Sequence, residues 1–522
     1  MMPEALPLAA IGNGRARALR EIPLLDETGL ALALREALGS GARLASYFGL
    51  SAEGGTELVA VLADDERNRL LAGRARVSGP AFPSIASDFP QAQLFEREIA
   101  EQFGLVPEGH PWLKRVRYRR SWTGRDAWGL DEAEPIVPGS GEFYRVEGEQ
   151  VHEVAVGPVH AGVIEPGHFR FQCHGERVFH LEIALGYQHR GIEEAMIGGP
   201  RPRSLHYAET AAGDSTIAHA TCYCMAIEAL ASDSGEGWAL RSSARAQAIG
   251  AVALELERLA NHVGDLGAIA GDVGFLPSAS FCGRVRGDFL NMSELVCGSR
   301  FGRGLMRPGG IAFDLDEETS AELLRRLEAA ERDAMGAINL MLGDQSVLAR
   351  LEGTGTVPRE IALELGLVGP AARASGLARD TRFDQSSGIY RLAQIPVSTA
   401  QTGDVLARAL VRRLEVQRSI AFIREQLGSL PAGPAGEAQN QAESVPGRLI
   451  SESIAVALCE GWRGEACHAA VTDASGRLAR YKIVDPSFHN WPALAYAMRD
   501  EEISDFPLCN KSFNLSYCGH DL

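Results

Sequence analysis

Alternation of apolar and polar positions predicts two strands near the start of the chain. Apolar residues dominate the runs 44–48 and 57–62, and each run has the length of a buried strand. Residues 64–75 follow a helix-like spacing and predict a helix. The chain is therefore expected to begin with a small mixed α/β domain over residues 1–120.

A second element of this domain is an amphipathic helix over residues 91–103. Leu94, Phe95, Ile99 and Phe103 fall on one stripe of a helix, and glycine follows at once. Such a stripe packs against a core. We expect the charged positions between these residues to face solvent or a partner protein.

Beyond residue 120 the pattern changes twice. Residues 121–150 are rich in Gly, Pro and acidic residues and are interpreted as a linker. From residue 151 to 522 a larger domain follows. Its start alternates around Gly175, which predicts a hairpin of residues 169–171 and 177–181. A set of long helical patterns then follows, over residues 205–232, 241–270, 284–299, 316–342 and 403–427. Residues 428–447 predict a loop, and residues 448–522 mix helix and strand.

The fold class predicted from these patterns is α+β. A small α/β domain precedes a large, mainly helical domain that has a small sheet. With 522 residues and 45% apolar positions, the chain can bury a sizeable core.

Charge and hydropathy exclude several classes of function. The formal net charge is −17, from 68 acidic and 51 basic residues, which argues against nucleic-acid binding and against electrostatic attachment to anionic lipid. No apolar run reaches the length of about 20 residues that spans a bilayer. The start of the chain lacks the pattern of a signal peptide. We therefore expect a cytoplasmic chain that meets a membrane only through partner proteins.

Cysteine usage gives little sign of a metal site. The nine cysteines are scattered and form no CxxC pair, so any iron–sulfur cluster would belong to a partner subunit. Cys222 and Cys224 form a CxC after His219, which is either a metal-binding group or, more often for such cysteines, part of an apolar core. No GxGxxG motif follows a predicted strand, so direct NAD binding is not expected.

The helix at 91–103 belongs to a longer pattern. Its surroundings read Phe82-Pro83-Ser84, Phe89-Pro90, Phe95-Glu96-Arg97-Glu98, Phe103-Gly104 and Gly109-His110-Pro111. This string resembles the small companion subunit of respiratory complex I over about 50 residues.

The large domain resembles the large subunit of nickel–iron hydrogenases and its relative, the quinone-site subunit of complex I. Five strings carry the resemblance, in the family's order: 157–160 continuing through 165–171 (GPVH…EPGHFRF), 186–193 (GYQHRGIE), 257–262 (ERLANH), 306–310 (MRPGG) and 485–491 (DPSFHNW). Fusion of both parts in one chain is similar to the energy-converting branch, of the hydrogenase-4 and formate-hydrogenlyase type.

The resemblance also shows what this chain lacks. The family's four metal-binding cysteines, two at each end of the domain, would fall at Ala212, Ser215, Ser516 and Gly519. Soft thiolates hold nickel and iron, whereas a neutral hydroxyl binds such metals poorly. Cys518 lies out of register and stands alone. No metal is therefore expected in this chain.

A quinone is the remaining cofactor that the resemblance implies. His168 matches the family's quinone-site histidine, and Asp272 matches its carboxylate partner. Such a carboxylate would raise the pKa of the imidazole and let it protonate a reduced quinone. The family's tyrosine, however, falls at Gly213. The alternatives are a structural histidine on a loop and an ordinary turn aspartate.

Two more residues match the hydrogenase pattern. Glu193 matches the glutamate that passes protons, and Arg463 matches the arginine over the metal's diatomic ligands. The alternative is that both are structural ion-pair partners, because a buried charge must be paired.

These observations leave three hypotheses for the function. In the first, the chain is a subunit of a complex I–like, NADH–quinone oxidoreductase-like membrane complex, and passes electrons from an iron–sulfur small subunit to a quinone-like acceptor. In the second, the chain is a catalytically silent coupling subunit with a relic site. The third, a hydrogenase with an altered centre, is disfavoured by the missing thiolates. In the first two, the chain lies on the cytoplasmic face of the inner membrane, joined to antiporter-like membrane subunits that move ions.

Overall fold

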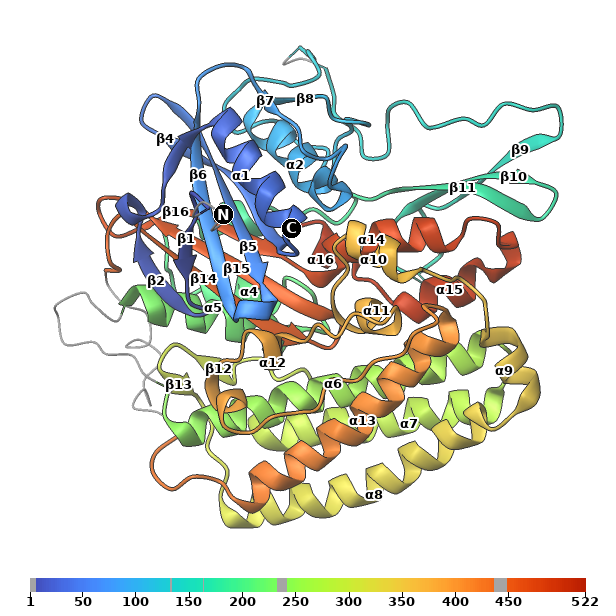
Figure 1. The fold of residues 1–522 in the computed structure, drawn as a ribbon. Helices are drawn as coiled ribbons and strands as arrows, with labels where there is room; N and C mark the ends of the chain where they lie inside the picture. Colours follow the sequence, from blue (N-terminus) through green and yellow to red (C-terminus); the bar gives the residue numbers. More distant parts are fainter. Residues whose placement is uncertain (1–5, 132–133, 163, 232–241, 436–447) are drawn as a thin grey trace, which may run out of the picture.

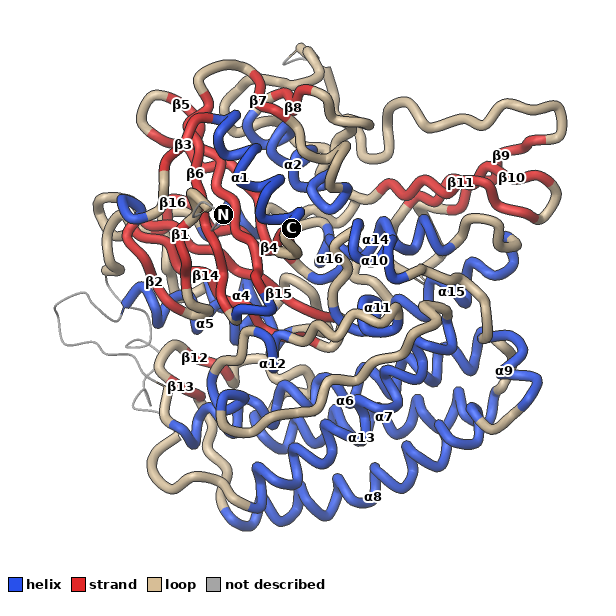
Figure 2. Tube along the Cα trace, viewed as in Figure 1, coloured by secondary structure: helices blue, strands red, loops and turns tan. Residues whose placement is uncertain are grey.

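A computed structural model describes residues 6–131, 134–162, 164–231, 242–435 and 448–522 (Figure 1). A sheet-rich part formed by the start and end of the chain lies on one side. A group of long helices lies on the other, and a hairpin projects beside them (Figures 1 and 2). This arrangement agrees with the predicted α+β class. The predicted loop 428–447 lies largely outside the described residues.

The N-terminal sheet has the strand order β1-β6-β5-β4, and β3 pairs with β6 in parallel. Its strands are β1 (Ala9–Ile11), β3 (Leu24–Asp26), β4 (Arg43–Ala52), β5 (Gly55–Asp64) and β6 (Arg69–Val77). The predicted strands at 44–48 and 57–62 are confirmed as parts of β4 and β5. The domain also contains α1 (Glu27–Gly39), α2 (Gln93–Phe103) and the parallel pair β7 (Ala81–Pro83) and β8 (Val106–Glu108).

The predicted helix over 64–75 is wrong. Asn68 takes a left-handed conformation (φ 48°) and turns the chain, so that β6 runs back antiparallel to β5. Leu70, Leu71 and Ala72 are all buried because both faces of β6 are covered. A strand buried on both faces shows no alternation, and its apolar run imitates a helix.

Helix α2 confirms the predicted amphipathic helix, but its acidic residues are not solvated. Phe95, Ile99 and Phe103 enter the core, and Gly104 ends the helix in a left-handed conformation (φ 66°). Glu96 and Glu98 are also buried, at 0% and 1% exposure. The expectation that these charges face solvent or a partner is wrong.

A four-stranded sheet joins the two ends of the chain. Its order is β16-β15-β14-β2, with β2 (Arg15–Ala18), β14 (Ser453–Gly461), β15 (Gly464–Thr472) and β16 (Leu478–Val484). Strand β2 pairs antiparallel with β14, so the N-terminal segment contributes to the sheet of the large domain. The domain limits 1–120, 121–150 and 151–522 stay a prediction.

Strand β14 is buried on both faces and separates two cores. Ile454, Val456 and Leu458 pack in the core of the N-terminal domain. Their neighbours Ala455, Ala457 and Cys459 pack in the core of the large domain. Because successive side chains of a strand point to opposite faces, one strand serves both cores.

The predicted hairpin is confirmed as part of a three-stranded sheet in the order β11-β10-β9. Its strands are β9 (Val151–Val156), β10 (His168–His174) and β11 (Arg177–Ala184). In Figure 1 this sheet projects away from the N-terminal domain.

The long helices are α6 (Ala244–Asp272), α7 (Leu276–Cys297), α8 (Glu317–Leu342) and α13 (Val405–Gly428). They run side by side (Figure 1), and α6 is packed against both α7 and α13. Helix α7 begins earlier than predicted, with Pro277 in its first turn. The predicted helix 205–232 is interrupted, since α4 (Ser204–Glu209) and α5 (Thr216–Ala231) are separate.

Shorter elements complete the large domain. They are α3 (Ile192–Met196), β12 (Met306–Arg307), β13 (Gly310–Ile311), α9 (Gln345–Leu351), α10 (Arg359–Glu364), α11 (Gly369–Ala374), α12 (Thr381–Asp384), α14 (Pro486–Ala497), α15 (Phe506–Phe513) and α16 (Tyr517–His520).

Candidate functional site

The two segments where the resemblance places the family's cysteine motifs, here named the vacated motifs, lie at the N-terminal ends of two helices. Ala212 and Ser215 occupy the break between α4 and α5, and both are buried. Ser516 caps α16, because its Oγ accepts a hydrogen bond from the main-chain N–H of Gly519 at 2.9 Å. A cap of this kind satisfies a helix N-terminus, so Ser516 has a structural role in place of a metal ligand.

The position of Gly519 has no room for a cysteine. A β-carbon built there would lie 2.6 Å from Cγ of Asp485, which is fully buried. Across the described residues, no group of three or more His, Cys, Asp or Glu side chains is arranged to hold a metal ion. The residues present do not fit a nickel–iron centre.

Arg463 joins the two motif regions. It lies on the turn between β14 and β15, and its terminal nitrogens donate to the two carboxylate oxygens of Asp214 at 2.6 and 2.8 Å. Its Nε donates to the main-chain oxygen of Asn514 at 2.5 Å, and its guanidinium stacks on Trp462 at 3.8 Å. Burial alone would lower the pKa of Arg463, but Asp214 outweighs it and holds the pKa above its usual value. The predicted alternative of an ion-pair partner fits this geometry.

A chain of buried hydrogen bonds starts beside Gly519. His219 Nε2 lies 3.0 Å from Asp485 Oδ2, and His219 Nδ1 lies 3.0 Å from His468 Nε2. His468 Nδ1 lies 2.8 Å from the Tyr481 hydroxyl. All four side chains are buried.

The charge state of His468 limits the order of donors along this chain. Burial holds the pKa of His468 well below its usual value, so its ring is neutral. A neutral imidazole carries one N–H, so His468 donates to only one of its two neighbours, His219 Nδ1 or the Tyr481 oxygen, and accepts from the other.

Glu193 is held ionised by two cations. Its carboxylate accepts from Arg480 at 2.9 Å, from Lys482 at 2.8 Å and from the main-chain N–H of Ile483 at 3.0 Å. Burial alone would raise the pKa of Glu193, but Lys482 and Arg480 lower it to about 2. A carboxylate with this pKa does not take up a proton near neutral pH. The geometry favours the structural interpretation of Glu193 over proton transfer.

His168 and Asp272 have different surroundings. His168 begins β10, with its Nδ1 3.4 Å from the Gly157 main-chain oxygen and its ring 5.5 Å from that of Phe143. Asp272 lies at the end of α6, where partial desolvation raises the pKa of its carboxyl and Lys511 opposes the shift. No hydrogen bond joins His168 to Asp272 in the described part of the chain. Their pairing at a quinone stays a prediction.

Several residues of this site were not singled out by the sequence patterns. Asp214 lies between Ala212 and Ser215, and Asp485 begins the 485–491 string, but their respective partners Arg463 and His219 are hundreds of residues away. Glu257, from the ERLANH string, accepts from the Ile217 main-chain N–H at 2.7 Å at the start of α5. Burial raises the pKa of Glu257 to about 8, so this carboxyl is mostly protonated at neutral pH.

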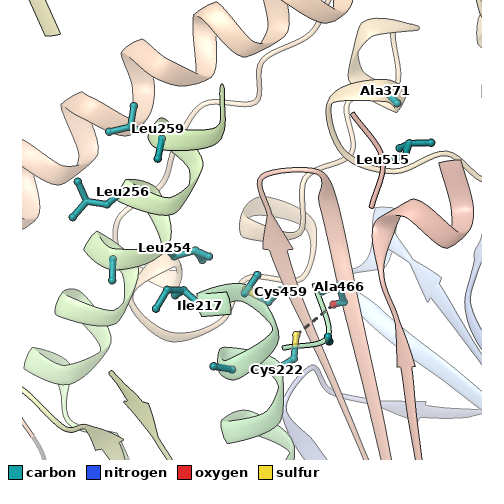
Figure 3. Close-up of a cluster of buried hydrophobic side chains, with 14 of the residues drawn as sticks. Ile217, Cys222, Leu254, Leu256, Leu259, Ala371, Cys459, Ala466 and Leu515 are labelled. Atoms are coloured by element: carbon teal, nitrogen blue, oxygen red, sulfur yellow. Dashed lines mark hydrogen bonds between the residues drawn. The ribbon is translucent and has the colours of Figure 1, made fainter. Parts of the chain in front are cut away.

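The CxC motif belongs to the core. Cys222 donates to the main-chain oxygen of Ala466 at 3.4 Å and lies beside Cys459 and Ile217 (Figure 3). Cys222 and Cys224 are 0% and 3% exposed. Of the two alternatives, the core interpretation fits the structure.

Gly213 lies on an open face next to the vacated motifs. It is exposed, and a β-carbon there would meet no atom within 4 Å. Nearby, Arg190 donates to the main-chain oxygens of Thr210 and Ala211 at 2.7 and 2.9 Å. Cys518 is half-buried beside Ser516. The site is therefore closed internally but accessible from this side.

Comparison with known proteins assigns both parts of the chain. Residues 272–521 match the family model of the respiratory-chain NADH dehydrogenase 49 Kd subunit, and residues 29–131 match that of the 30 Kd subunit. Formate hydrogenlyase subunit 5 of Escherichia coli is 30% identical over 489 residues, covering 91% of this chain and 81% of that protein. The chain belongs to this family of complex I and hydrogenase large subunits.

Other relatives come from both branches of the family. The carbon monoxide-induced hydrogenase of Rhodospirillum rubrum is 31% identical over 366 residues, or 70% of this chain and 97% of that protein. NADH-quinone oxidoreductase subunit 4 of Thermus thermophilus is 29% identical over 376 residues, or 68% and 90%. A chain of a membrane-bound sulfane sulfur reductase has the same fold, with a TM-score of 0.64 at 23% identity, covering 73% of this chain and all of that one.

These matches confirm the predicted family, the α+β fold class and the role of a complex I–like, hydrogenase-like oxidoreductase subunit. Among the described helices, none has the length and apolar character needed to cross a membrane.

Proposed function

We propose that this chain is the acceptor-side subunit of a membrane-bound complex I–like complex and holds no metal. It completes a site for a quinone-like acceptor together with an iron–sulfur small subunit. The complex couples this transfer to ion movement through antiporter-like membrane subunits, and the chain reaches the cytoplasmic face of the membrane through these partners.

The arrangement around Arg463 carries this proposal. The space between the two former ligand motifs is filled by the Arg463–Asp214 ion pair and by Asp485, whereas the face at Gly213 is open. A closed interior with an accessible face suits a reactant that arrives from outside the chain, between it and a partner. His168 and Cys518 are two of the half-buried polar side chains at this end of the domain.

A second function, silent coupling, is favoured by the absence of a hydrogen bond between His168 and Asp272 in the described residues. In that case the ion pair at Arg463 is a relic that keeps the two ends of the domain together, and no acceptor binds at Gly213.

One variant distinguishes the two functions. Gly213→Phe adds a side chain into open space, so the fold is expected to tolerate it while the acceptor face is blocked. The complex would be purified from native membranes, its clusters reduced with dithionite, and their reoxidation by decylubiquinone followed by stopped-flow absorbance. The matched control is Gly336→Phe, on an exposed position of α8 that also has no atom within 4 Å.

We expect decylubiquinone to reoxidise the clusters in the wild type and in Gly336→Phe, and to do so at least tenfold more slowly in Gly213→Phe. If the reduced clusters of an intact wild-type complex are not reoxidised by decylubiquinone, the result would support the coupling function instead. Nickel and iron would be assayed on the same samples; nickel in equal amount to the chain would contradict the proposal.

A further inference from the structure

A cavity lies where the N-terminal domain meets the large domain. It has a volume of about 580 Å³, which is in the range of small-molecule sites. Helix α2, strand β11 and helices α10 and α14 contribute to its walls. The apolar and aromatic side chains that line it include Leu94, Trp112, Tyr118, Leu185, Trp491 and Tyr496.

Arg97 brings an unpaired positive charge to this cleft. It lies on α2 between two buried glutamates that have their own partners, and its side chain lines the cavity. Its Nε is buried with no hydrogen-bond partner, and the guanidinium makes no ion pair with any described residue. Burial lowers the pKa of Arg97 to about 10, against the opposing influence of Glu182 and Tyr118. Arg97 is half-buried, and desolvating a guanidinium without an ion-pair partner is costly, so an anionic ligand that supplied this partner would be stabilised here.

The other strong cations of the cleft wall are already neutralised. Lys114 is ion-paired with Glu182, and Arg115 is ion-paired with Asp126 at 2.5 Å. Both carboxylates are therefore engaged in ion pairs with other cations, and Glu182 acts on Arg97 only at a distance, without an ion pair. The cation that keeps no ion-pair partner among the described residues lies on the α2 side.

The remaining charged groups are at the rim. Arg499 is exposed and lies 5.1 Å from the centre of the Tyr496 ring, and Glu364 is exposed on α10. Burial, together with Arg499 and Lys114, keeps the pKa of His180 below its usual value, so this ring is neutral near pH 7. The charges of Arg499 and Glu364 are opposite and cancel in the net charge of the cleft. The positive charge of Arg97 is not cancelled by them.

We propose that this cleft binds a small organic anion, with one carboxylate or phosphate group at Arg97 and an apolar body against Leu94, Trp112 and Trp491. A guanidinium matches either group with two parallel hydrogen bonds, and the surrounding rings suit a hydrocarbon or aromatic body. The proposal does not depend on the proposed electron acceptor.

The cleft is connected to the vacated motifs through one side chain, that of Trp491. The Trp491 ring lines the cavity, and its Nε1 donates to the main-chain oxygen of Ser516 at 3.4 Å. The same ring lies 5.0 Å from that of Tyr517, at an angle of 73°. A ligand against Trp491 therefore touches a side chain that also holds the start of α16.

The test compares ten-carbon probes with charged and uncharged head groups. Binding of decanoate and of 1-decanol to the full-length chain would be measured by calorimetry, with decyl phosphate as a third probe for the preferred head group. The variant is Arg97→Gln, and the matched control is Arg20→Gln at an exposed position outside the cleft. We expect decanoate to bind the wild type about tenfold or more tightly than decanol, as for a hydrogen bond to a charged group. The preference should vanish in Arg97→Gln and persist in Arg20→Gln.

The Tm of the wild type and of Arg97→Gln, measured with and without decanoate, tests the proposal even if binding is too weak for calorimetry. Because Arg97 lacks an acid partner, the ligand-free Arg97→Gln chain should melt no lower than the wild type, and decanoate should raise the Tm of the wild type alone. A variant that melts lower without ligand, or that keeps the preference for decanoate, would overturn the proposal. Binding to the isolated chain that is lost in the native complex would show that a partner subunit fills the cleft instead.

Discussion

The carboxylate of Asp485 occupies the space that a β-carbon at Gly519 would need. A side chain at 519 would have its Cβ 2.6 to 2.9 Å from three atoms of Asp485, and Asp485 is held in place by His219. A glycine at 519 and the buried carboxylate of Asp485 are therefore linked, because a larger residue at 519 would meet that carboxylate. Restoring a metal site would require both to change.

The first prediction follows from this contact. Gly519→Cys should lower the free energy of unfolding by about 1–3 kcal/mol, the usual cost of overpacking a filled interior. Ser516→Cys replaces one small polar side chain by another and should cost less. Urea unfolding of both single variants measures the difference. Equal stabilities would show that Asp485 moves aside readily.

The second prediction concerns the ion pair that joins the two motif regions. Asp214→Ala leaves the Arg463 guanidinium, whose side chain is 5% exposed, without its carboxylate. Removing one partner of a buried pair costs about 3–5 kcal/mol, and partial exposure of Asp214 should reduce this figure. The double variant Asp214→Ala/Arg463→Met should recover part of the loss in urea unfolding. A double variant less stable than Asp214→Ala would mean that Arg463 is stabilised chiefly by Asn514 and Trp462.

The third prediction is a pH dependence at Glu193. Its pKa is lowered from 4.5 to about 2 in the folded chain, so the carboxylate stabilises the fold above the unfolded-state value and loses this contribution as pH falls towards 2. The difference in free energy of unfolding between wild type and Glu193→Gln should be largest at pH 6. It should shrink by roughly 3 kcal/mol on acidification. A difference independent of pH would contradict the lowered pKa.

The fourth prediction concerns Glu257, whose pKa is raised to about 8. Its carboxyl should stay protonated at pH 7 and give an infrared carbonyl band of a neutral acid. The band should lose intensity in Glu257→Gln, while the matched Glu193→Gln should leave it unchanged. Because the unfolded chain ionises this group from pH 4.5 upward, Glu257→Gln should also be more stable than the wild type at pH 7. An unchanged infrared band would mean that Glu257 is ionised.

The sequence predicted an element correctly where its apolar pattern fits only one type of secondary structure. The stripe of α2 and the hairpin around Gly175 follow from local spacing, and both are confirmed. The error at residues 64–75 has a local cause as well: Asn68 makes a turn, and the strand after it is covered on both faces. The break between α4 and α5 was not predicted, because Ala212 continues the apolar helical pattern between the two helices.

The candidate site was predictable only in part. Motif register predicts, without any structure, that Ser516 and Gly519 stand at the family's ligand positions. It gave no access to the pairs Arg463–Asp214 and His219–Asp485, because each pair joins segments that are close only in the folded chain. The charge state of Glu193 likewise depends on Lys482, from a strand nearly three hundred residues later.

The pairing of β2 with β14 has a consequence for how this chain is made. During synthesis, β2 leaves the ribosome long before the strand that completes its hydrogen bonds exists. The sheet β1-β6-β5-β4 can assemble early from neighbouring segments, but its packing against Ile454, Val456 and Leu458 has to wait for nearly the whole chain. The nascent protein therefore carries an unpaired strand and an uncovered apolar surface through most of its translation, the period in which chaperones act on such segments.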